Sequence, residues 1–246
     1  MQSPGYLVPQ WPAPQQVQAL VTLRTGGYSS GPYASFNLAD HTDDDPEAVS
    51  NNRSLLREYF SLPAEPVWLQ QVHSDRIIRA DQKTDAAEAD GSWTATTGVV
   101  CVVMTADCLP VLICSRDGSR VAAVHAGWRG LHAGVIPNAV KALATDPAEL
   151  LVWLGPAIGP RAFEVGPEVV HAFNDVLPEN AAAFTQTDEQ HWLCDLYRLA
   201  RLQLERLGVV AVYGGNECTY TDKQRFYSYR RDGKTGRMAS LIWLQP

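Results

Sequence analysis

The stretch that decides the fold is Gly98–His125. It reads GVVCVVMTADCLPVLIC over residues 98–114 and, beyond the turn RDGS, RVAAVH over residues 120–125. Branched apolar residues dominate these runs, as is typical of buried strands, and the turn has the Asp-Gly composition of a tight connection. The stretch predicts strands over residues 98–104, 109–114 and 120–125, with the polar TAD segment and Cys108 between the first two.

Before this stretch, the sequence predicts a strand, a loop and a helix. An apolar run over residues 17–23 indicates the strand, and the Gly/Ser/Pro-rich residues 25–35 indicate a long loop of the kind that usually serves function. Residues 44–60 predict the helix, because a proline follows an acidic run and apolar side chains then recur at helical spacing. Residues 67–124 predict mainly strands, interrupted by the polar segment 81–93.

Helices become more frequent after this stretch. The segment beyond Gly130 has a helical apolar face with Pro137 inside it, which predicts a kink or a restart because proline lacks a backbone donor. Further predicted elements are strands over 150–155 and 209–215, helices over 167–176 and 195–207, and an irregular Gly/Pro loop over 155–166. The tail, residues 226–244, predicts a hairpin that brings Arg230, Arg231 and Arg237 close together.

Strands and helices alternate without a strict βαβ period. This pattern favours an α/β or α+β fold in which mixed β-sheets are sandwiched and covered by helices. The 246 residues are 46% hydrophobic, and no Ser/Gly-rich linker or charge block divides them. We therefore expect a single domain over residues 1–246.

The charge balance indicates small-molecule partners. With 20 basic and 27 acidic residues, the formal net charge is −7, which argues against a nucleic-acid or polybasic membrane surface. The N-terminus lacks the pattern of a signal peptide, and no run approaches the roughly 20 apolar residues of a membrane span. Five cysteines without a CxxC pair fit a reducing compartment. We expect a cytoplasmic protein.

His73, Cys108 and His125 are the candidate metal ligands. His73 ends the strand-like VWLQQVH, Cys108 follows the first strand of the deciding stretch, and His125 ends the last one. A fold that gathers strand ends would bring these side chains together. Two imidazoles and one thiolate, with no obvious fourth protein ligand, are typical of an open zinc site that can activate water or polarise a substrate oxygen.

Copper is the alternative metal, because two histidines and a cysteine also occur in blue copper centres. Met104 is the only nearby candidate for the weak axial ligand. The chain has six histidines and no HxH pair, too little imidazole for a multicopper oxidase. Zinc, which is redox-silent and accepts tetrahedral N/S ligation, suits this ligand set and a reducing cytoplasm better.

The remaining candidate site residues are polar. We place the chemistry at Cys108, His73 and Asp107, where the Asp107 carboxylate either transfers a proton, orients a ligand histidine or caps its turn. Candidate substrate-binding residues are those whose side chains could hold phosphate or read a base or ribose edge. They are Asn37, Gln71, Arg24, Arg53, Arg129 and Arg230.

Several strings resemble one known family. They are LRTGGYSSGPYASFNL, PVWLQQVHS, MTADCLPVL, AAVHAGWRGL, WLGPAIGPRAFEVG and FYSYRRDGKTGRMA. Together they are similar to the bacterial YfiH-type proteins of the laccase-domain family, variously called polyphenol oxidases, purine nucleoside phosphorylases and peptidoglycan editing factors. The resemblance runs nearly the full chain. It implies zinc at His73, Cys108 and His125, and an α/β sandwich fold.

The resemblance also implies a reaction. Phosphorolysis of adenosine, guanosine or inosine, and methylthioadenosine, together with adenosine deamination, is the leading hypothesis. A first alternative is an amidase that removes a wrongly added serine from a UDP-MurNAc cell-wall precursor. Two further alternatives are a metal-free hydrolase with Cys108 as nucleophile and His125 as its base, and a copper polyphenol oxidase.

Overall fold

The computed structural model describes residues 3–82 and 87–245, and it contains three β-sheets. The first sheet is antiparallel throughout. In spatial order it consists of β1 (Tyr6–Leu7), β2 (Val17–Thr22), β13 (Met238–Leu244) and β5 (Val100–Thr105). The second sheet is mixed, because its two outer pairs are parallel and its inner pairs are antiparallel. It consists of β12 (Ala211–Gly214), β8 (Leu150–Leu154), β6 (Leu109–Ser115), β7 (Val121–Ala126), β4 (Gly91–Thr94) and β3 (Ile77–Arg79).

The helices and the smallest sheet complete the element list. The third sheet consists of β10 (Phe184–Gln186), β11 (Trp192–Cys194) and β9 (Glu164–Val165). The α-helices are α1 (Pro46–Tyr59), α2 (Trp128–Ala133), α3 (Val135–Leu143), α4 (Pro167–Asn174), α5 (Leu196–Arg206) and α6 (Tyr229–Asp232). The 3₁₀ turns are Gly31–Tyr33, Ala80–Gln82, Pro147–Glu149 and Pro178–Ala183.

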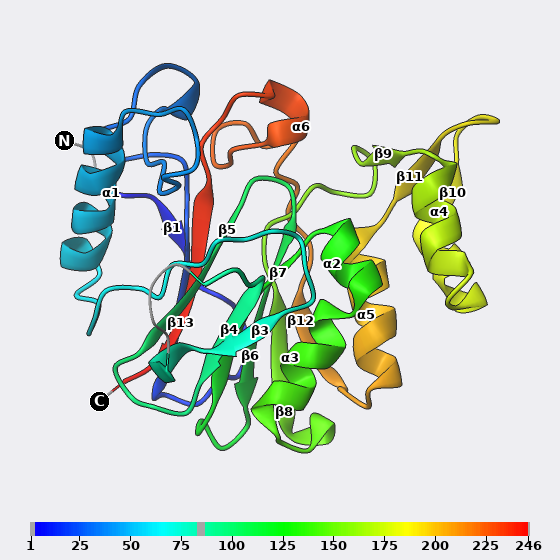
Figure 1. The fold of residues 1–246 in the computed structure, drawn as a ribbon, viewed down its shortest axis with the longest axis horizontal. Coiled ribbons are helices and arrows are strands. Elements are labelled where there is room, and N and C mark those ends of the chain that lie inside the picture. The colour runs from blue at the N-terminus through cyan, green and yellow to red at the C-terminus, as the bar shows by residue number, and fades with distance from the viewer. Residues whose placement is uncertain (1–2, 83–86, 246) are drawn as a thin grey trace.

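The two larger sheets pack face to face between helices (Figure 1). Apolar side chains on the inner faces, such as Val103 of β5 and Leu112 of β6, form the core between the sheets. Leu56 of α1 packs on the outer face of the first sheet, and α3 and α5 cover the outer face of the second. The expectation of mixed sheets sandwiched and covered by helices is confirmed. Within the described part of the chain, no helix combines the length and apolar composition that a membrane crossing needs.

The deciding stretch forms the junction of both layers. Residues 100–105 become β5 of the first sheet, whereas 109–115 and 121–126 become the hairpin β6–β7 of the second. Every residue of these strands is buried, which explains why the sequence shows apolar runs instead of alternation. The turn after β5 therefore carries Cys108 from one sheet to the other.

The restart expected at Pro137 is observed. Helix α2 ends at Gly134, whose φ of 96° lies in the left-handed region that glycine adopts without a steric penalty, and α3 begins at the next residue. Pro137 then lies in the first turn of α3, where its missing N–H has no helical partner to lose. The break separates α2 from α3, which lies along the second sheet (Figure 1). Trp128 and Arg129, at the start of α2, line the candidate site.

Two expectations about the segment before β5 are wrong, one about a strand and one about the length of a polar interruption. Residues 67–73 form only isolated bridges, at Val67 and Gln70, because backbone N–H groups at the end of this segment are bound by the carboxylate of Asp90. The polar interruption expected over residues 81–93 is shorter than predicted, since Gly91–Thr94 form β4; residues 83–86 lie outside the described residues.

The expected hairpin in the tail is also wrong. Ser228 caps the helical turn α6, whose third residue donates its backbone N–H to the serine hydroxyl, so residues 226–232 are not a strand. The last strand, β13, instead pairs with β2 and β5. As a consequence, the arginines of the tail separate: Arg231 donates to the carbonyls of Thr219 and Phe226, whereas Arg230 and Arg237 both line the candidate site.

Candidate metal centre and its pocket

The three candidate ligands lie together. The ligand atoms of His73, Cys108 and His125 are all within 4.8 Å of one another, and among the described residues no other group of histidine, cysteine or carboxylate side chains is gathered in this way. The Cys108 Sγ lies 3.7 Å from Nε2 of His73. The two imidazole rings meet edge to face with centroids 4.8 Å apart. The set has the composition and spacing of a metal site with an open position.

Local structure explains how these side chains meet. Cys108 directly precedes β6, and His125 lies near the end of β7, opposite Pro110 in the β6–β7 ladder. The antiparallel register therefore places Cys108 and His125 at the same end of the β6–β7 pair. His73 reaches them from an irregular loop in which its own φ is 61°, so it does not close a strand as expected. A Cβ on Gly127 would lie 2.9 Å from the His73 ring and 3.0 Å from the Cys108 sulfur, so only glycine fits beside the ligands.

Asp90 holds the two histidines in place. Its fully buried carboxylate accepts hydrogen bonds from the backbone N–H groups of residues 72–74 and from the hydroxyl of Ser74. It also accepts from Nδ1 of His125 at 2.8 Å, which leaves Nε2 of that ring for the metal. One carboxylate thus fixes both the backbone of His73 and the ring of His125.

The charges at the site reinforce one another. Burial opposes ionisation of the Cys108 thiol, but the adjacent His125 and His73 outweigh it and lower the pKa of the thiol to about 6. Burial also disfavours a protonated His125, yet the Cys108 thiolate and the Asp90 carboxylate raise the pKa of this imidazole to about 9. At neutral pH the pair is therefore a thiolate beside an imidazolium, and a metal would displace the imidazolium proton.

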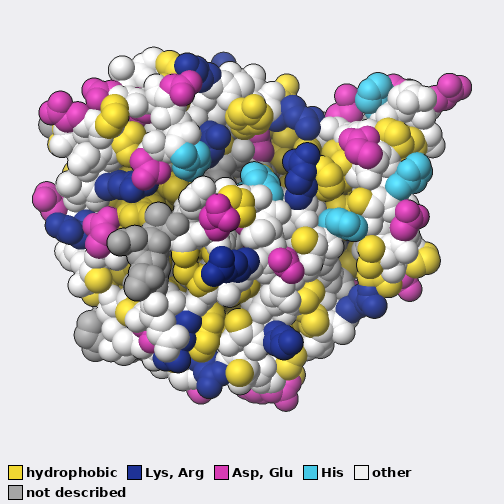
Figure 2. Space-filling view, viewed as in Figure 1, with side chains coloured by type: hydrophobic (Ala, Val, Ile, Leu, Met, Phe, Trp, Pro, Cys, Tyr) yellow, Lys and Arg dark blue, Asp and Glu magenta, His cyan; other side chains and the backbone are white. Residues whose placement is uncertain are grey.

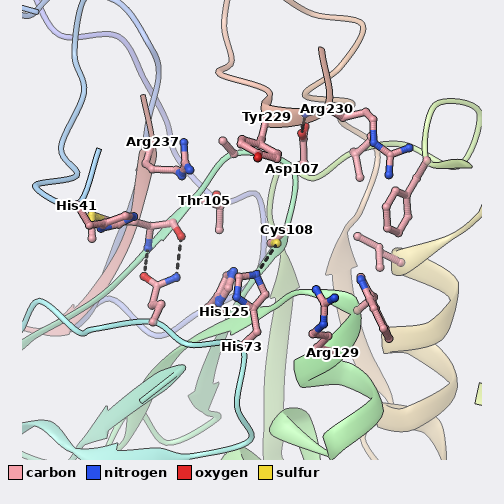
Figure 3. A pocket seen from close by; sticks show the side chains of 17 residues that line it. His41, His73, Thr105, Asp107, Cys108, His125, Arg129, Tyr229, Arg230 and Arg237 are labelled. Atoms are coloured by element: carbon pink, nitrogen blue, oxygen red, sulfur yellow. Dashed lines mark hydrogen bonds between the residues drawn. The ribbon is translucent and has the colours of Figure 1, made fainter. Parts of the chain in front are cut away.

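The ligands lie on the floor of a cavity of about 600 Å³ (Figure 3). Its wall combines aromatic and apolar side chains with cationic ones. The residues other than the three ligands are His41, Gln71, Met104, Thr105, Ala106, Asp107, Trp128, Arg129, Ile158, Phe163, Leu196, Tyr229, Arg230 and Arg237. Figure 2 shows histidine and arginine side chains gathered on this face of the molecule. The cavity can hold an organic ligand that carries both a ring system and negative charge.

Half of the expected substrate-binding residues reach this cavity. Arg129 and Arg230 line it, stacking on the rings of Trp128 and Phe163 respectively. Gln71 lines it as well, but both ends of its amide are bound to the backbone of Met104.

The other three expected residues have structural partners elsewhere. Arg24 donates to the carbonyls of Ala34 and Lys223. Arg53 donates to the carbonyl of Leu38 and forms an ion pair with Asp40. Asn37 is fully buried, where its side chain accepts from the backbone N–H of Arg237 and binds the loop that precedes α1. These three side chains do not line the cavity.

Asp107 lines the cavity, and no hydrogen bond is described between its carboxylate and His73 or His125. Its carboxylate accepts from the hydroxyl of Thr219 at 2.6 Å and from the backbone N–H of Arg230 at 2.7 Å. Its φ of 97° allows the sharp turn from β5 to β6. The carboxylate that orients a ligand histidine is therefore Asp90, and Asp107 anchors the tail segment to the turn.

Sequence reasoning missed several residues of the site. Asp90 sits at the end of a polar run before β4, a position without any motif, and only the tertiary contact with His125 reveals it. Thr105 falls in the polar segment between two predicted strands, and His41 belongs to no motif, so neither was named as a candidate. The hairpin expected in the tail placed Arg237 beside Arg230. Both arginines do line the cavity, although the hairpin does not form.

Comparison with known proteins shows what the whole chain resembles. The family model described as "Multi-copper polyphenol oxidoreductase laccase" matches residues 18–245. A purine nucleoside phosphorylase of Pseudomonas aeruginosa is 54% identical over 242 residues, covering 98% of this chain and 99% of that protein. The purine nucleoside phosphorylase YfiH of Escherichia coli is 52% identical over 239 residues, covering 97% and 98%.

Solved structures agree with the sequence relatives. A crystal structure of a Neisseria meningitidis protein superposes with a TM-score of 0.95 at 49% identity, covering 98% of this chain and 100% of that one. YlmD from Geobacillus stearothermophilus superposes with a TM-score of 0.94 at 31% identity, covering 100% and 98%. The similarity therefore extends over sequence and fold alike.

Proposed function

The chain belongs to the multi-copper polyphenol oxidoreductase laccase family, and from that premise we propose that it is a zinc-dependent purine nucleoside phosphorylase. Its proposed substrates are adenosine, guanosine or inosine, and methylthioadenosine, together with inorganic phosphate. The relatives at 45–54% identity that carry the name purine nucleoside phosphorylase support this reading. We place the activity in the cytoplasm, where the unpaired cysteines would stay reduced.

The observation that carries the proposal is the combination of the ligand set with the lining of its cavity. The rings of Trp128 and Phe163 offer flat apolar surfaces of the kind that stack on a purine. Arg129, Arg230 and Arg237 supply positive charge for an anionic co-substrate in the same cavity. A nucleoside and phosphate could thus meet beside the candidate ligands.

The donor set fits zinc better than the copper in the family description. Two imidazoles and one thiolate within 4.8 Å suit tetrahedral zinc with one open position. A multicopper oxidase needs several adjacent imidazole-rich sites, and the described residues gather a single such group. When bound, zinc would supply Lewis-acid polarisation of a substrate oxygen or of water.

Phosphorolysis requires a new bond and a broken one. A phosphate oxygen forms a bond to C1′ of the ribose while the bond from C1′ to the purine nitrogen breaks, and the leaving purine takes up a proton. Positioning is the contribution of the protein, since arginines orient phosphate and aromatic rings hold the base. Asp107 and Cys108 are the ionisable groups at the turn beside this reaction centre.

We also propose adenosine deaminase activity at the same open position. In this reaction a water oxygen replaces the 6-amino group of adenine, and ammonia leaves. The route needs no phosphate, so it provides an internal comparison for the phosphorolytic route. A metal-free Cys108 hydrolase is the competing mechanism, favoured by the lowered pKa of the thiol beside His73 and His125.

The test is incubation of the purified zinc-loaded protein with adenosine, with and without phosphate, followed by chromatography of the products. We expect adenine and ribose 1-phosphate only when phosphate is present, and inosine in both samples. Chelation should abolish both activities and added zinc should restore them, whereas full activity after chelation would favour the Cys108 hydrolase. The variant His73→Ala should lose turnover while keeping its melting temperature, and Asp117→Asn, in the turn beyond β6, is the control. If the parent protein forms neither adenine nor inosine, the proposal is overturned.

A further inference from the structure

One hydroxyl in the cavity wall has no partner. Thr105, the last residue of β5, is 2% exposed, and its Oγ1 is buried without a hydrogen bond from any described residue. The neighbouring backbone is fully engaged, since Met104 exchanges both its hydrogen bonds with the Gln71 amide. A buried hydroxyl without a partner is energetically costly, so its presence in a cavity wall indicates a ligand atom that completes it.

A guanidinium lies at the same end of the cavity. Arg237 directly precedes β13, and the next residue, Met238, is paired with Thr105 in the β13–β5 ladder. The sheet register therefore brings Arg237 beside Thr105, and Figure 3 shows Thr105 between Arg237 and the histidine pair.

The guanidinium keeps free donors for a ligand. Its Nη1 donates to the carbonyls of Thr235 and Gly236, which fixes the plane of the group. No hydrogen bond is described for Nε or Nη2, and none of the carboxylates in the described ranges lies within ion-pair distance of Arg237. Burial lowers the pKa of Arg237, against the opposing pull of the negative charges on Cys108 and Asp107. A desolvated cation of this kind is stabilised by a bound anion.

The other arginines of the cavity are placed differently. Arg129 and Arg230 are exposed and stack on Trp128 and Phe163. Their side of the cavity therefore combines aromatic faces with positive charge, which suits a ring system. Arg237 also lies over a ring, that of Tyr229, but its guanidinium is held by two backbone carbonyls beside a buried hydroxyl and His41, an arrangement that suits a compact oxyanion.

We propose that Arg237 and Thr105 form an oxyanion subsite, next to the candidate metal ligands, that binds the inorganic phosphate consumed in phosphorolysis. The assignment of phosphate as the physiological occupant rests on the proposed function. The guanidinium fork donates to the phosphate oxygens, and the Thr105 hydroxyl donates to a further one. The nucleoside then lies toward Trp128 and Phe163, with its C1′ between the two halves of the cavity.

The experiment measures phosphate binding with and without turnover. Binding of inorganic phosphate to the zinc-loaded protein is followed by ³¹P line broadening without nucleoside, and the KM for phosphate is measured with adenosine. The variants are Arg237→Gln, Arg237→Lys and the nearly isosteric Thr105→Val. The control is Ser240→Ala, which removes another buried hydroxyl without a described partner, in β13 and away from the cavity wall. Circular dichroism of each variant establishes that it is folded.

We expect Arg237→Gln to raise the KM for phosphate about tenfold or more, and Thr105→Val to raise it severalfold, because each removes a hydrogen bond to an anion. Arg237→Lys should fall between parent and Arg237→Gln, since it keeps the charge and loses the fork. Phosphate-independent formation of inosine should change less than phosphorolysis in these three variants. Ser240→Ala should match the parent.

The outcomes separate the subsite from the proposed function. Phosphorolysis with an unchanged KM for phosphate in Arg237→Gln and Thr105→Val would overturn the subsite and leave the function standing. If the parent binds phosphate but shows no phosphorolysis, and both variants bind phosphate more weakly, the subsite is supported and the proposed function is overturned. A parent that binds no phosphate would overturn the subsite as well.

Discussion

Two buried carboxylates lie on either side of the ligand cluster, and they serve different parts of the molecule. Asp90, before β4, binds His125 and the backbone of residues 72–74. Asp107, in the turn after β5, binds Thr219 and the backbone of Arg230. Both side chains are buried, yet one holds the candidate metal ligands and the other holds the cavity wall.

The difference teaches that proximity in sequence does not assign a role. Asp107 is adjacent to Cys108, so sequence reasoning made it a candidate for orienting a histidine. Asp90 is far from both histidines along the chain, and it is the residue that touches them. The floor of the cavity is therefore organised by the contacts of Asp90 with β7 and with the loop of His73, whereas its wall is organised by the C-terminal segment.

The largest expected effect follows from Asp90→Asn. In the parent, the donors around Asp90 share two carboxylate oxygens, whereas the asparagine amide offers only one oxygen. The NH₂ group of the amide would also face N–H groups, so His73 and His125 would lose their fixed positions. We expect zinc affinity to fall about 10–100-fold, as for other residues that orient metal ligands. The free energy of unfolding of the metal-free protein should fall by about 3–5 kcal/mol, because a buried charge pair is broken. Competition with a chelating dye and urea titration measure the two quantities.

The matched control for this change is Asp117→Asn. Asp117 also accepts several hydrogen bonds, from Ser115 and Ser119, but it does so in an exposed turn. Its variant should keep the zinc affinity of the parent. Equal zinc affinity in the parent and in Asp90→Asn would contradict the role assigned to Asp90.

The corresponding change on the other side, Asp107→Asn, should act on stability more than on metal binding. Asparagine keeps one acceptor oxygen, so one of the bonds from Thr219 and Arg230 is weakened. We expect a loss of about 1.5–3 kcal/mol in the free energy of unfolding, typical of hydrogen bonds to a charged group. Zinc affinity should stay close to that of the parent. A larger loss of zinc affinity in Asp107→Asn than in Asp90→Asn would reverse the comparison.

Acid titration tests the role of Asp90 further. Burial raises the pKa of Asp90, but the hydrogen bonds from His125 and Ser74 outweigh it and lower the pKa to about 2. A carboxyl whose pKa is lower in the folded state stabilises the fold above its unfolded pKa, near 4, and loses that contribution as the pH falls toward 2. We expect about 2 kcal/mol of stability to disappear over this range in the metal-free parent.

Urea titrations at a series of pH values between 5 and 2 measure this loss. The variant Asp90→Asn lacks the titrating group, so its stability should fall less steeply over the same range. Parallel acid profiles for the parent and Asp90→Asn would show that the ionisation of Asp90 does not stabilise the fold.

These contacts also explain how far the sequence could lead. The strands of the deciding stretch and most of the helices follow from apolar runs and caps, which are local signals. The choice of His73, Cys108 and His125 as candidate ligands follows from residue chemistry, and the structure brings these three side chains together. The tail hairpin failed because a local pattern cannot register that Ser228 caps a helical turn. Asp90 and Thr105 could not be assigned because their surroundings are formed by segments that are distant in sequence. Arg237 was expected near Arg230, but through a hairpin that does not form.

The smallest expected effects come from the hydroxyls that donate to the two carboxylates. Ser74 Oγ donates to Asp90 at 2.7 Å, and Thr219 Oγ1 donates to Asp107 at 2.6 Å. Ser74→Ala and Thr219→Val should each cost about 1 kcal/mol in the free energy of unfolding, since each removes one hydrogen bond and leaves its carboxylate with others. Only Ser74→Ala should also weaken zinc binding, by a small factor, because its carboxylate holds the ligands. If the two variants lowered zinc affinity equally, the floor and the wall of the cavity would behave as one unit, and the distinction between Asp90 and Asp107 would fail.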